Sequence, residues 1–122
     1  MDRTEAPERL SLGSTRLLGA VALVFALALA WHAVATWQLF QSRRPETTLS
    51  ARLSAARIGR TMEPWNPNAR ADYGYVASQQ LLEDGRNQEA VDTMVAAYKD
   101  AVGDAEMLAY LRHAQAVLAA DR

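Results

Sequence analysis

The sequence predicts an all-α protein in which one transmembrane helix is followed by a small helical domain of three to four helices. Three observations support this fold class. Residues 17–40 form a stretch of 24 residues without a formally charged side chain. After it, apolar residues recur at helical spacing, and no segment alternates as a half-buried strand would. Proline, glycine, asparagine and aspartate stand between these segments, where helices begin and end.

Length and charge narrow the classes of function. The 122 residues allow one small domain besides a membrane anchor. The chain has no cysteine and only two histidines, so no metal centre or other cofactor is expected. Residues 1–60 carry a net charge of +4 and residues 61–122 carry −5, and this acidic half argues against nucleic acid as a partner. No phosphate-binding loop or nucleophile motif is present, so an enzyme is not expected.

The apolar stretch 17–40 is long enough to cross a bilayer. At about 1.5 Å per residue, it reaches about 36 Å, whereas the hydrocarbon core is about 30 Å thick. Aromatic and basic side chains gather at its C-terminal end, as is typical of a membrane interface. Pro45 then disfavours a helical conformation at the preceding residue. The interfacial anchors predicted from this pattern are Trp31, Trp37, Arg43 and Arg44.

The predicted organisation has four parts: an N-terminal cytoplasmic tail (1–16), a transmembrane helix (17–40), a basic juxtamembrane helix (41–63) and a helical domain (64–122). A cleavable signal peptide is the alternative, because residues 33–35 (Ala-Val-Ala) are similar to a cleavage site. The apolar stretch continues beyond that site, which favours an uncleaved anchor.

Two arguments on topology disagree. Five arginines follow the span within about twenty residues, whereas three precede it, and a plain count would place the C-terminal domain in the cytoplasm. A short basic tail, however, is more easily retained than translocated. Arginine outnumbers lysine twelve to one, a composition typical of bacteria. We therefore expect a single-pass protein of the bacterial inner membrane with its C-terminal domain in the periplasm.

Small residues recur along one face of the predicted span. In lipid, such a face lets the backbone of another helix approach closely, although alanine is common in bacterial anchors in any case. The expected partners are the lipid bilayer and other membrane or envelope proteins, including subunits of a larger complex. The predicted helix-packing face consists of Gly19, Ala22, Ala26, Ala30 and Ala33.

His32 is an ionisable residue near the end of the span. One interpretation is an interfacial histidine that water or headgroups reach. In the other, Ala28-x-x-x-His32 with Trp37 beyond it resembles the pigment-binding helix of bacterial light-harvesting polypeptides. That resemblance implies His32 as a ligand of a bacteriochlorophyll magnesium, with Ala28 leaving room for the macrocycle.

The remaining helices are predicted from periodicity and from their end signals. Asn66 and Asp104 are good N-caps, and Pro67 suits a first helical position. Gly85 and Gly103 stop the helices that precede them. His113 is expected at the surface. The predicted helices cover residues 47–62, 68–83, 87–102 and 105–119.

The segment from Gly85 to Val91 (Gly-Arg-Asn-Gln-Glu-Ala-Val) resembles the turn and second-helix start of a tetratricopeptide repeat. The resemblance implies a repeat-like helical hairpin in which Gly85 makes the turn, Ala90 and Ala97 let the helices approach, and Met94 fills the bulky position. The first helix departs from the pattern, because it lacks the usual tryptophan, leucine, glycine and tyrosine. An unrelated three-helix packing therefore stays open.

The expected function is that of a membrane-anchored protein–protein interaction module, a scaffold or adaptor of the bacterial cell envelope. In the tetratricopeptide family, binding uses the concave face made by the first helices of the repeats. The alternative is an accessory single-pass subunit of a large energy-converting, photosynthetic or transport complex, in which the anchor packs on other helices.

Overall fold

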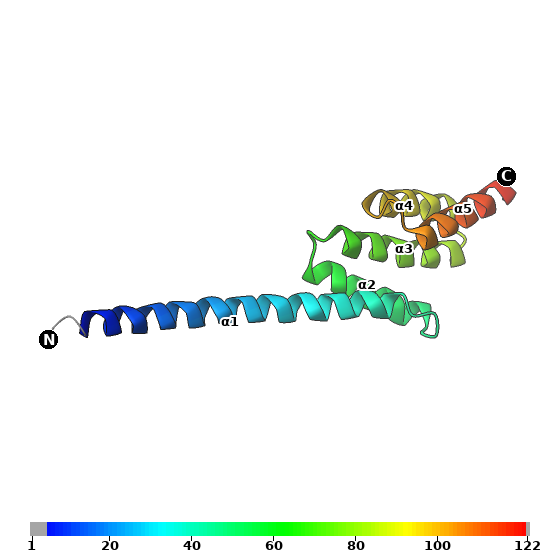
Figure 1. The fold of residues 1–122 in the computed structure, drawn as a ribbon. Helices are drawn as coiled ribbons and strands as arrows, with labels where there is room; N and C mark the ends of the chain where they lie inside the picture. Colours follow the sequence, from blue (N-terminus) through cyan, green and yellow to red (C-terminus); the bar gives the residue numbers. More distant parts are fainter. Residues whose placement is uncertain (1–4, 122) are drawn as a thin grey trace. The chain divides into compact units, whose positions relative to one another are not determined.

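The computed structural model describes residues 5–121 of the chain, with side-chain environments from residue 13 onward, and in this range it is all-helical without strands. The prediction of an all-α fold with one long apolar N-terminal helix and a small helical domain is confirmed. Residues 1–4 of the predicted tail lie outside the described range, and the tail is helical from Glu5 onward. The helices are α1 (Glu5–Ser42), α2 (Leu49–Met62), α3 (Pro67–Glu83), α4 (Asn87–Asp100) and α5 (Ala105–Ala120) (Figure 1).

The long helix α1 contains the candidate membrane span. Its segment Gly13–Ser42 is long and apolar enough to cross a membrane, and none of its most apolar window is buried by the rest of the chain. The helix ends at Ser42, three residues before Pro45, because a proline restricts the residue before it to extended conformations.

The chain forms two compact units, and the second of them begins at Val34. We call these unit 1 and unit 2. Ala35 and Ser42 of α1 are fully buried in unit 2, and Gly59 of α2 leaves room for Leu39. The last turns of α1 are therefore the first helical element of the domain, whereas the sequence placed the boundary after residue 40.

Local signals set the helix ends. The side chains of Asn66 and Asp104 accept hydrogen bonds from the backbone amides of Asn68 and Met107, so both predicted N-caps are confirmed. Thr48 caps α2 in the same way, and this helix therefore starts two residues later than predicted. Gly85 and Gly103 have φ values of +79° and +99°, a left-handed conformation in which a side chain is strained.

Helix α3 occupies the centre of unit 2, between α2 and α4, and α5 packs on α4. Helix α3 has buried residues around most of its circumference, including Ala71, Tyr75 and Val76. Met94 of α4 and Met107 of α5 are fully buried in the same core. A helix covered on two sides has no single apolar face, which is why the periodicity of α3 is weak in the sequence.

Candidate interaction groove

Helix α3, the first helix of the α3–α4 hairpin, and helix α5, which comes after the hairpin in the chain, border a hollow of about 340 Å³. Gln79, Leu82 and Glu83 line it from α3, and Tyr110 and His113 line it from α5. We call this hollow the α3–α5 groove. Its lining combines the apolar side chain of Leu82 with polar side chains that can form hydrogen bonds.

Aromatic stacking holds the two sides of the α3–α5 groove together. The rings of Tyr75 and Tyr110 are stacked with centroids 5.3 Å apart, and His113 tilts against Tyr110 at 5.8 Å. Such ring pairs contribute about 0.5–1.5 kcal/mol beyond the area they bury. Burial also raises the pKa of the Tyr110 hydroxyl, an effect to which the charge of Glu83 adds. The Tyr110 hydroxyl is thus a hydrogen-bonding group over the pH range in which a partner would bind.

A second aromatic contact joins Tyr75 to the charged residues behind the groove. Its hydroxyl donates a hydrogen bond to Oε1 of Glu106 at 3.1 Å, and the guanidinium carbon of Arg43 lies 4.9 Å from its ring centroid. Burial raises the pKa of Tyr75 to about 12, with the Glu106 carboxylate adding to the rise. Tyr75 is therefore a neutral hydrogen-bond donor at physiological pH.

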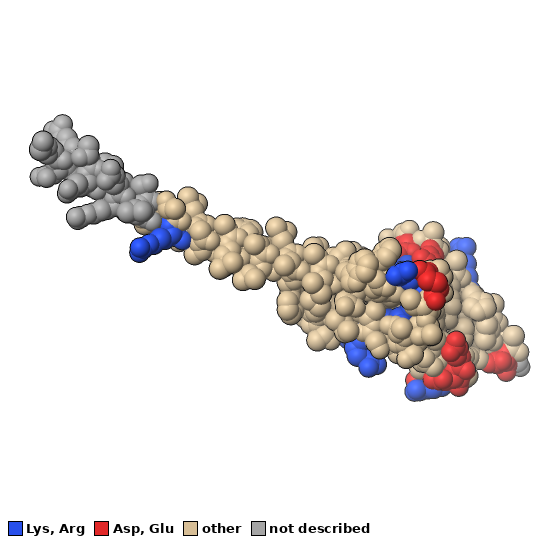
Figure 2. All heavy atoms as spheres, turned by 90° about the horizontal axis from the view of Figure 1, so that it is seen from below, with Lys and Arg blue, Asp and Glu red and all other residues tan. Residues whose placement is uncertain are grey.

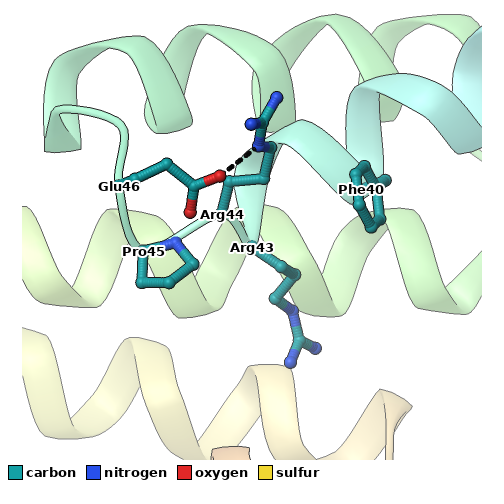
Figure 3. Close-up of a pocket in the computed structure, with 5 residues that line it drawn as sticks. All are labelled: Phe40, Arg43, Arg44, Pro45 and Glu46. Carbon is teal, nitrogen blue, oxygen red and sulfur yellow. Dashed lines mark hydrogen bonds and ion pairs between the residues drawn. The ribbon is translucent and has the colours of Figure 1, made fainter.

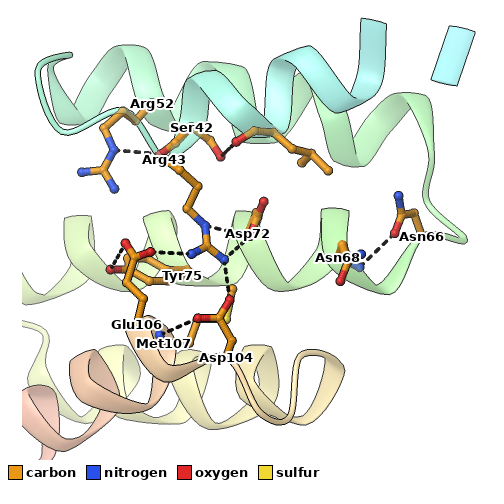
Figure 4. Close-up of polar contacts among 11 residues, drawn as sticks. Ser42, Arg43, Arg52, Asn66, Asn68, Asp72, Tyr75, Asp104, Glu106 and Met107 are labelled. Carbon is orange, nitrogen blue, oxygen red and sulfur yellow. Dashed lines mark hydrogen bonds and ion pairs between the residues drawn. The ribbon is translucent and has the colours of Figure 1, made fainter. Parts of the chain in front are cut away.

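Arg43 is the centre of a charged cluster that links three parts of unit 2 (Figure 4). Its Nη2 lies 2.6 Å from Oδ1 of Asp72 in α3 and 3.1 Å from Oδ2 of Asp104, the N-cap of α5. Its Nη1 lies 2.9 Å from Oε2 of Glu106 in the first turn of α5. One guanidinium directly after α1 therefore holds α3 and α5 together, and we call this set the Arg43 cluster.

Burial and charge act in opposite directions in this cluster. Burial raises the pKa of the Asp72 carboxyl, and the neighbouring charges of Asp104 and Glu106 add to the rise, while Arg43 opposes it. Burial alone would lower the pKa of Arg43, but the Asp72 and Asp104 carboxylates outweigh this effect, so its pKa is raised. The guanidinium is thus a permanent charge that offsets the burial of Asp72.

The side chain of Arg52 orients one residue of the groove. Its Nε donates to the backbone carbonyl of Ser42 at 2.8 Å, and its Nη1 donates to Oε1 of Gln79 at 3.0 Å. The amide group of Gln79 is thereby fixed with its oxygen toward Arg52. The basic juxtamembrane helix thus supports the groove through Arg52, and Arg60 packs over the Tyr73 ring at 4.6 Å.

Arg43 and Arg44 point in different directions (Figure 3). Arg44 donates to Glu46 at 2.7 Å in an exposed pair, beside a hollow of about 390 Å³ that Phe40 and Pro45 also line. Both arginines were predicted as interfacial anchors. In the structure, the side chain of Arg43 points into unit 2 and forms ion pairs with carboxylates of the protein.

The residues predicted for the repeat hairpin come together between α3 and α4. Ala90 and Met94 are fully buried, and Ala97 is nearly so. Nothing lies within 4 Å of a Cβ built at Gly85, so its role is the left-handed turn. Ser78, which stands where the repeat has its usual glycine, donates from Oγ to the sulfur of Met94 at 3.3 Å. Its single hydroxyl proton is shared with the Tyr75 carbonyl, which lies closer at 2.7 Å and satisfies this polar group inside the core.

The remaining predicted residues lie on the exposed surface of α1. All residues of the small face are exposed, and a Cβ built at Gly19 would meet nothing within 4 Å. His32 is exposed as well. Trp37 is stacked on Phe40 with ring centroids 5.7 Å apart, and both rings are more than half exposed. The small face consists of Gly19, Ala22, Ala26, Ala30 and Ala33, and Trp31 is also exposed.

Asp72 and Glu106 were not predicted from the sequence as partners of Arg43. A signal for Asp72 exists, because it lies three and four residues before Tyr75 and Val76, on a buried face of α3. A carboxylate on an apolar helix face requires a charged or hydrogen-bonding partner. The identity of that partner, 29 residues away, depends on tertiary structure and has no local signal.

Comparisons of the chain with protein-family models, curated proteins and solved structures found no match.

Proposed function

We propose that this chain is a membrane-anchored protein–protein interaction module of the bacterial inner membrane, with unit 2 in the periplasm and the α3–α5 groove as its binding surface. The groove carries the proposal, because Tyr110 and His113 face Gln79 and Glu83 across a hollow of about 340 Å³. An extended segment of a partner could place an apolar side chain on the Tyr110 ring and a donor against Glu83.

The link between the anchor and the groove supports this proposal. Arg43 directly follows α1 and binds Asp72 of α3 and Glu106 of α5, the two helices that border the groove. A partner held in the groove would thus be held close to the last turn of α1, which belongs to unit 2. The resemblance of the α3–α4 hairpin to a tetratricopeptide repeat points to the same surface, since that family binds partners through its first helices.

Site-specific photo-crosslinking in cells that express the full chain would test the groove. A photoreactive residue at His113 should give a crosslinked partner, and the same residue at Asp92, exposed on α4, should not. Glu83→Gln should weaken the crosslink from His113 without changing helicity. Equal crosslinking from both positions, or no effect of the glutamine, would argue against the groove.

The alternative is an accessory single-pass subunit of a larger membrane complex. The observation that favours it is the exposed small face of α1, where nothing approaches Gly19. In lipid, a face of this kind suits close contact with another helix. The mass of the protein extracted in mild detergent distinguishes the two: a stable large complex supports the subunit, and a free monomer supports the adaptor.

A further inference from the structure

The direction of α2 identifies one end of unit 2. At the start of α2, Arg52 bonds to the carbonyl of Ser42, the last residue of α1. Seven residues later, Gly59 lies against Leu39 and the carbonyl of Ala35. Moving forward along α2 therefore means moving backward along α1. The α2–α3 loop (63–66) must lie at the end where α1 joins unit 2, and we call this the proximal end.

The α4–α5 turn lies at the proximal end as well. Arg70, near the start of α3, pairs with Asp100 at the end of α4, whereas Ser78, further along α3, contacts Met94, so α4 runs back toward the start of α3. The α1–α2 loop (43–48) and the α3–α4 loop (84–86) lie toward the opposite, distal end (Figure 1), and the side chain of Arg43 extends from there to Asp104.

The loops at the two ends differ in polarity. Trp65 and Val102, in the proximal loops, are 67% and 77% exposed, more than any other large apolar side chain of unit 2. The charged residues of the same loops are turned inward: Glu63 is 5% exposed, and Asp104 is bonded to Arg43 and to the Met107 amide. The exposed residues of the distal loops include the charged side chains Glu46, Asp84 and Arg86.

The proximal end of unit 2 follows the candidate span directly in the chain. The 21 residues from 13 to 33 extend about 31 Å, close to the thickness of the hydrocarbon core. Unit 2 begins at the next residue, Val34. The proximal loops would then face the zone of the membrane that tryptophan favours.

Charge is also complementary to a lipid surface. Arg57 and Arg60 are exposed on α2, and among the described residues neither forms an ion pair with a carboxylate. On the face drawn in Figure 2, acidic side chains lie in several separate places on unit 2, some with basic side chains beside them. Anionic headgroups attract arginines that lie within a Debye length of the surface.

From the exposed apolar side chains of the proximal loops and the two α2 arginines that form no ion pair with a carboxylate, we propose that the proximal end of unit 2 docks on an anionic lipid bilayer, with Trp65 and Val102 entering the interface. This inference rests on the membrane anchoring of the proposed function. It adds an orientation: the domain sits with its α2–α3 and α4–α5 loops on the lipid and its distal loops in the water. A partner protein would reach the α3–α5 groove from the aqueous side.

Tryptophan quenching in the full chain, reconstituted in vesicles, tests the docking. One variant keeps only Trp65 (Trp31→Phe, Trp37→Phe), and a second keeps only Trp31 (Trp37→Phe, Trp65→Phe). The vesicles contain phosphatidylcholine with or without phosphatidylglycerol, and shallow brominated lipid and aqueous iodide serve as quenchers. We expect brominated lipid to quench both variants, and phosphatidylglycerol to increase the quenching of Trp65.

Matched charge variants separate docking from unfolding. In the Trp65-only background, Val102→Glu should cause a strong loss of quenching by brominated lipid, whereas Gln88→Glu, exposed on α4 toward the distal end, should not. Circular dichroism should report the same helicity for both variants. An equal response of the two variants would overturn the docking.

The remaining outcomes separate docking from anchoring. If brominated lipid quenches Trp31 while Trp65 stays open to iodide, the docking is overturned and the anchor stands. If Trp65 is shielded from iodide but not quenched by brominated lipid, protein covers the proximal end and the lipid proposal is wrong. A lack of Trp31 quenching would overturn the anchor and the docking together.

Discussion

Gly74 of α3 lies so close to α4 that a Cβ atom added to it would stand 2.8 Å from the Cβ of Ala97. Methyl groups essentially never approach so closely, and neither residue has a flexible side chain that could move away. Contact between the two helices of the hairpin therefore depends on this glycine, and any side chain at position 74 must push their backbones apart.

We predict that Gly74→Ala destabilises unit 2 by about 1–3 kcal/mol, despite the better helix propensity of alanine. Thermal unfolding of the full chain in detergent, followed by circular dichroism, measures the effect. Gly59→Ala is the matched control, because its new Cβ would lie 2.9 Å from the Cδ2 of Leu39, the end of a flexible side chain that can rotate. If the two variants melt alike, the backbone contact at Gly74 is not limiting.

The repeat resemblance indicated Ala97 as a small contact residue, but it could not indicate Gly74. In the repeat pattern, position 74 corresponds to a large aromatic residue, so the glycine counted as a departure. The structure explains it as the counterpart of Ala97. Local signals, in which one residue type suits one backbone conformation, correctly indicated the N-caps Asn66 and Asp104 and the turn at Gly85.

Features that depend on contacts between distant segments could not be predicted from the sequence. The apolar composition of residues 34–40 is equally compatible with lipid and with a protein core, so the start of unit 2 at Val34 has no signal of its own. In the same way, Arg43 follows an apolar helix as a lipid anchor would. Only the fold shows that Asp72 and Asp104 surround it.

The hairpin turn gives a second prediction. Ala90 is fully buried near the start of α4, so Ala90→Leu should overpack the α3–α4 contact and lower stability by about 1–3 kcal/mol. Gln88→Ala, whose side chain is exposed two residues earlier, should leave the melting temperature almost unchanged. A similar melting temperature for both variants would mean that position 90 has spare volume.

The small face of α1 gives a third prediction. Ala26→Leu should disrupt association with other membrane helices, because a larger side chain prevents close backbone approach in lipid. Leu23→Ala, at a position that is 61% exposed, should retain it. Co-purification from native membranes in mild detergent measures the association. Equal recovery of partners with both variants would show that the face reflects composition alone.

The membrane topology gives a fourth prediction. The chain has no cysteine, so a single cysteine at Gln88, exposed on α4, labels only unit 2. If unit 2 is periplasmic, a membrane-impermeant maleimide should label this cysteine in cells whose outer membrane alone is permeabilised. Labelling that requires lysis of the inner membrane would place unit 2 in the cytoplasm, as the plain count of arginines suggests.

The Arg43 cluster makes stability depend on pH in a defined direction. Burial raises the folded-state pKa of Asp72 above its unfolded value, so ionising this carboxyl costs stability as the pH rises through the acid range. For Asp104, burial is outweighed by the Met107 amide and by Arg43, and its pKa is lowered. The stabilisation from Asp104 is therefore present above its unfolded pKa and is lost as the pH falls.

Arg43→Met removes the cation that opposes the rise in the pKa of Asp72 and contributes to the lowered pKa of Asp104, and it leaves Asp72 buried beside Asp104. We predict a loss of about 2–3 kcal/mol at pH 7, somewhat below the value for a fully buried pair because the cluster is partly open to water. The deficit should shrink below about pH 4, since protonated carboxyls no longer need the guanidinium. Urea unfolding of both proteins in detergent at the two pH values measures it. Arg44→Met removes only the exposed ion pair with Glu46. Its free energy of unfolding should stay close to that of the unsubstituted protein at both pH values. A deficit for Arg43→Met that is the same at both pH values would show that the arginine stabilises unit 2 through its packing on Tyr75, and not through its charge.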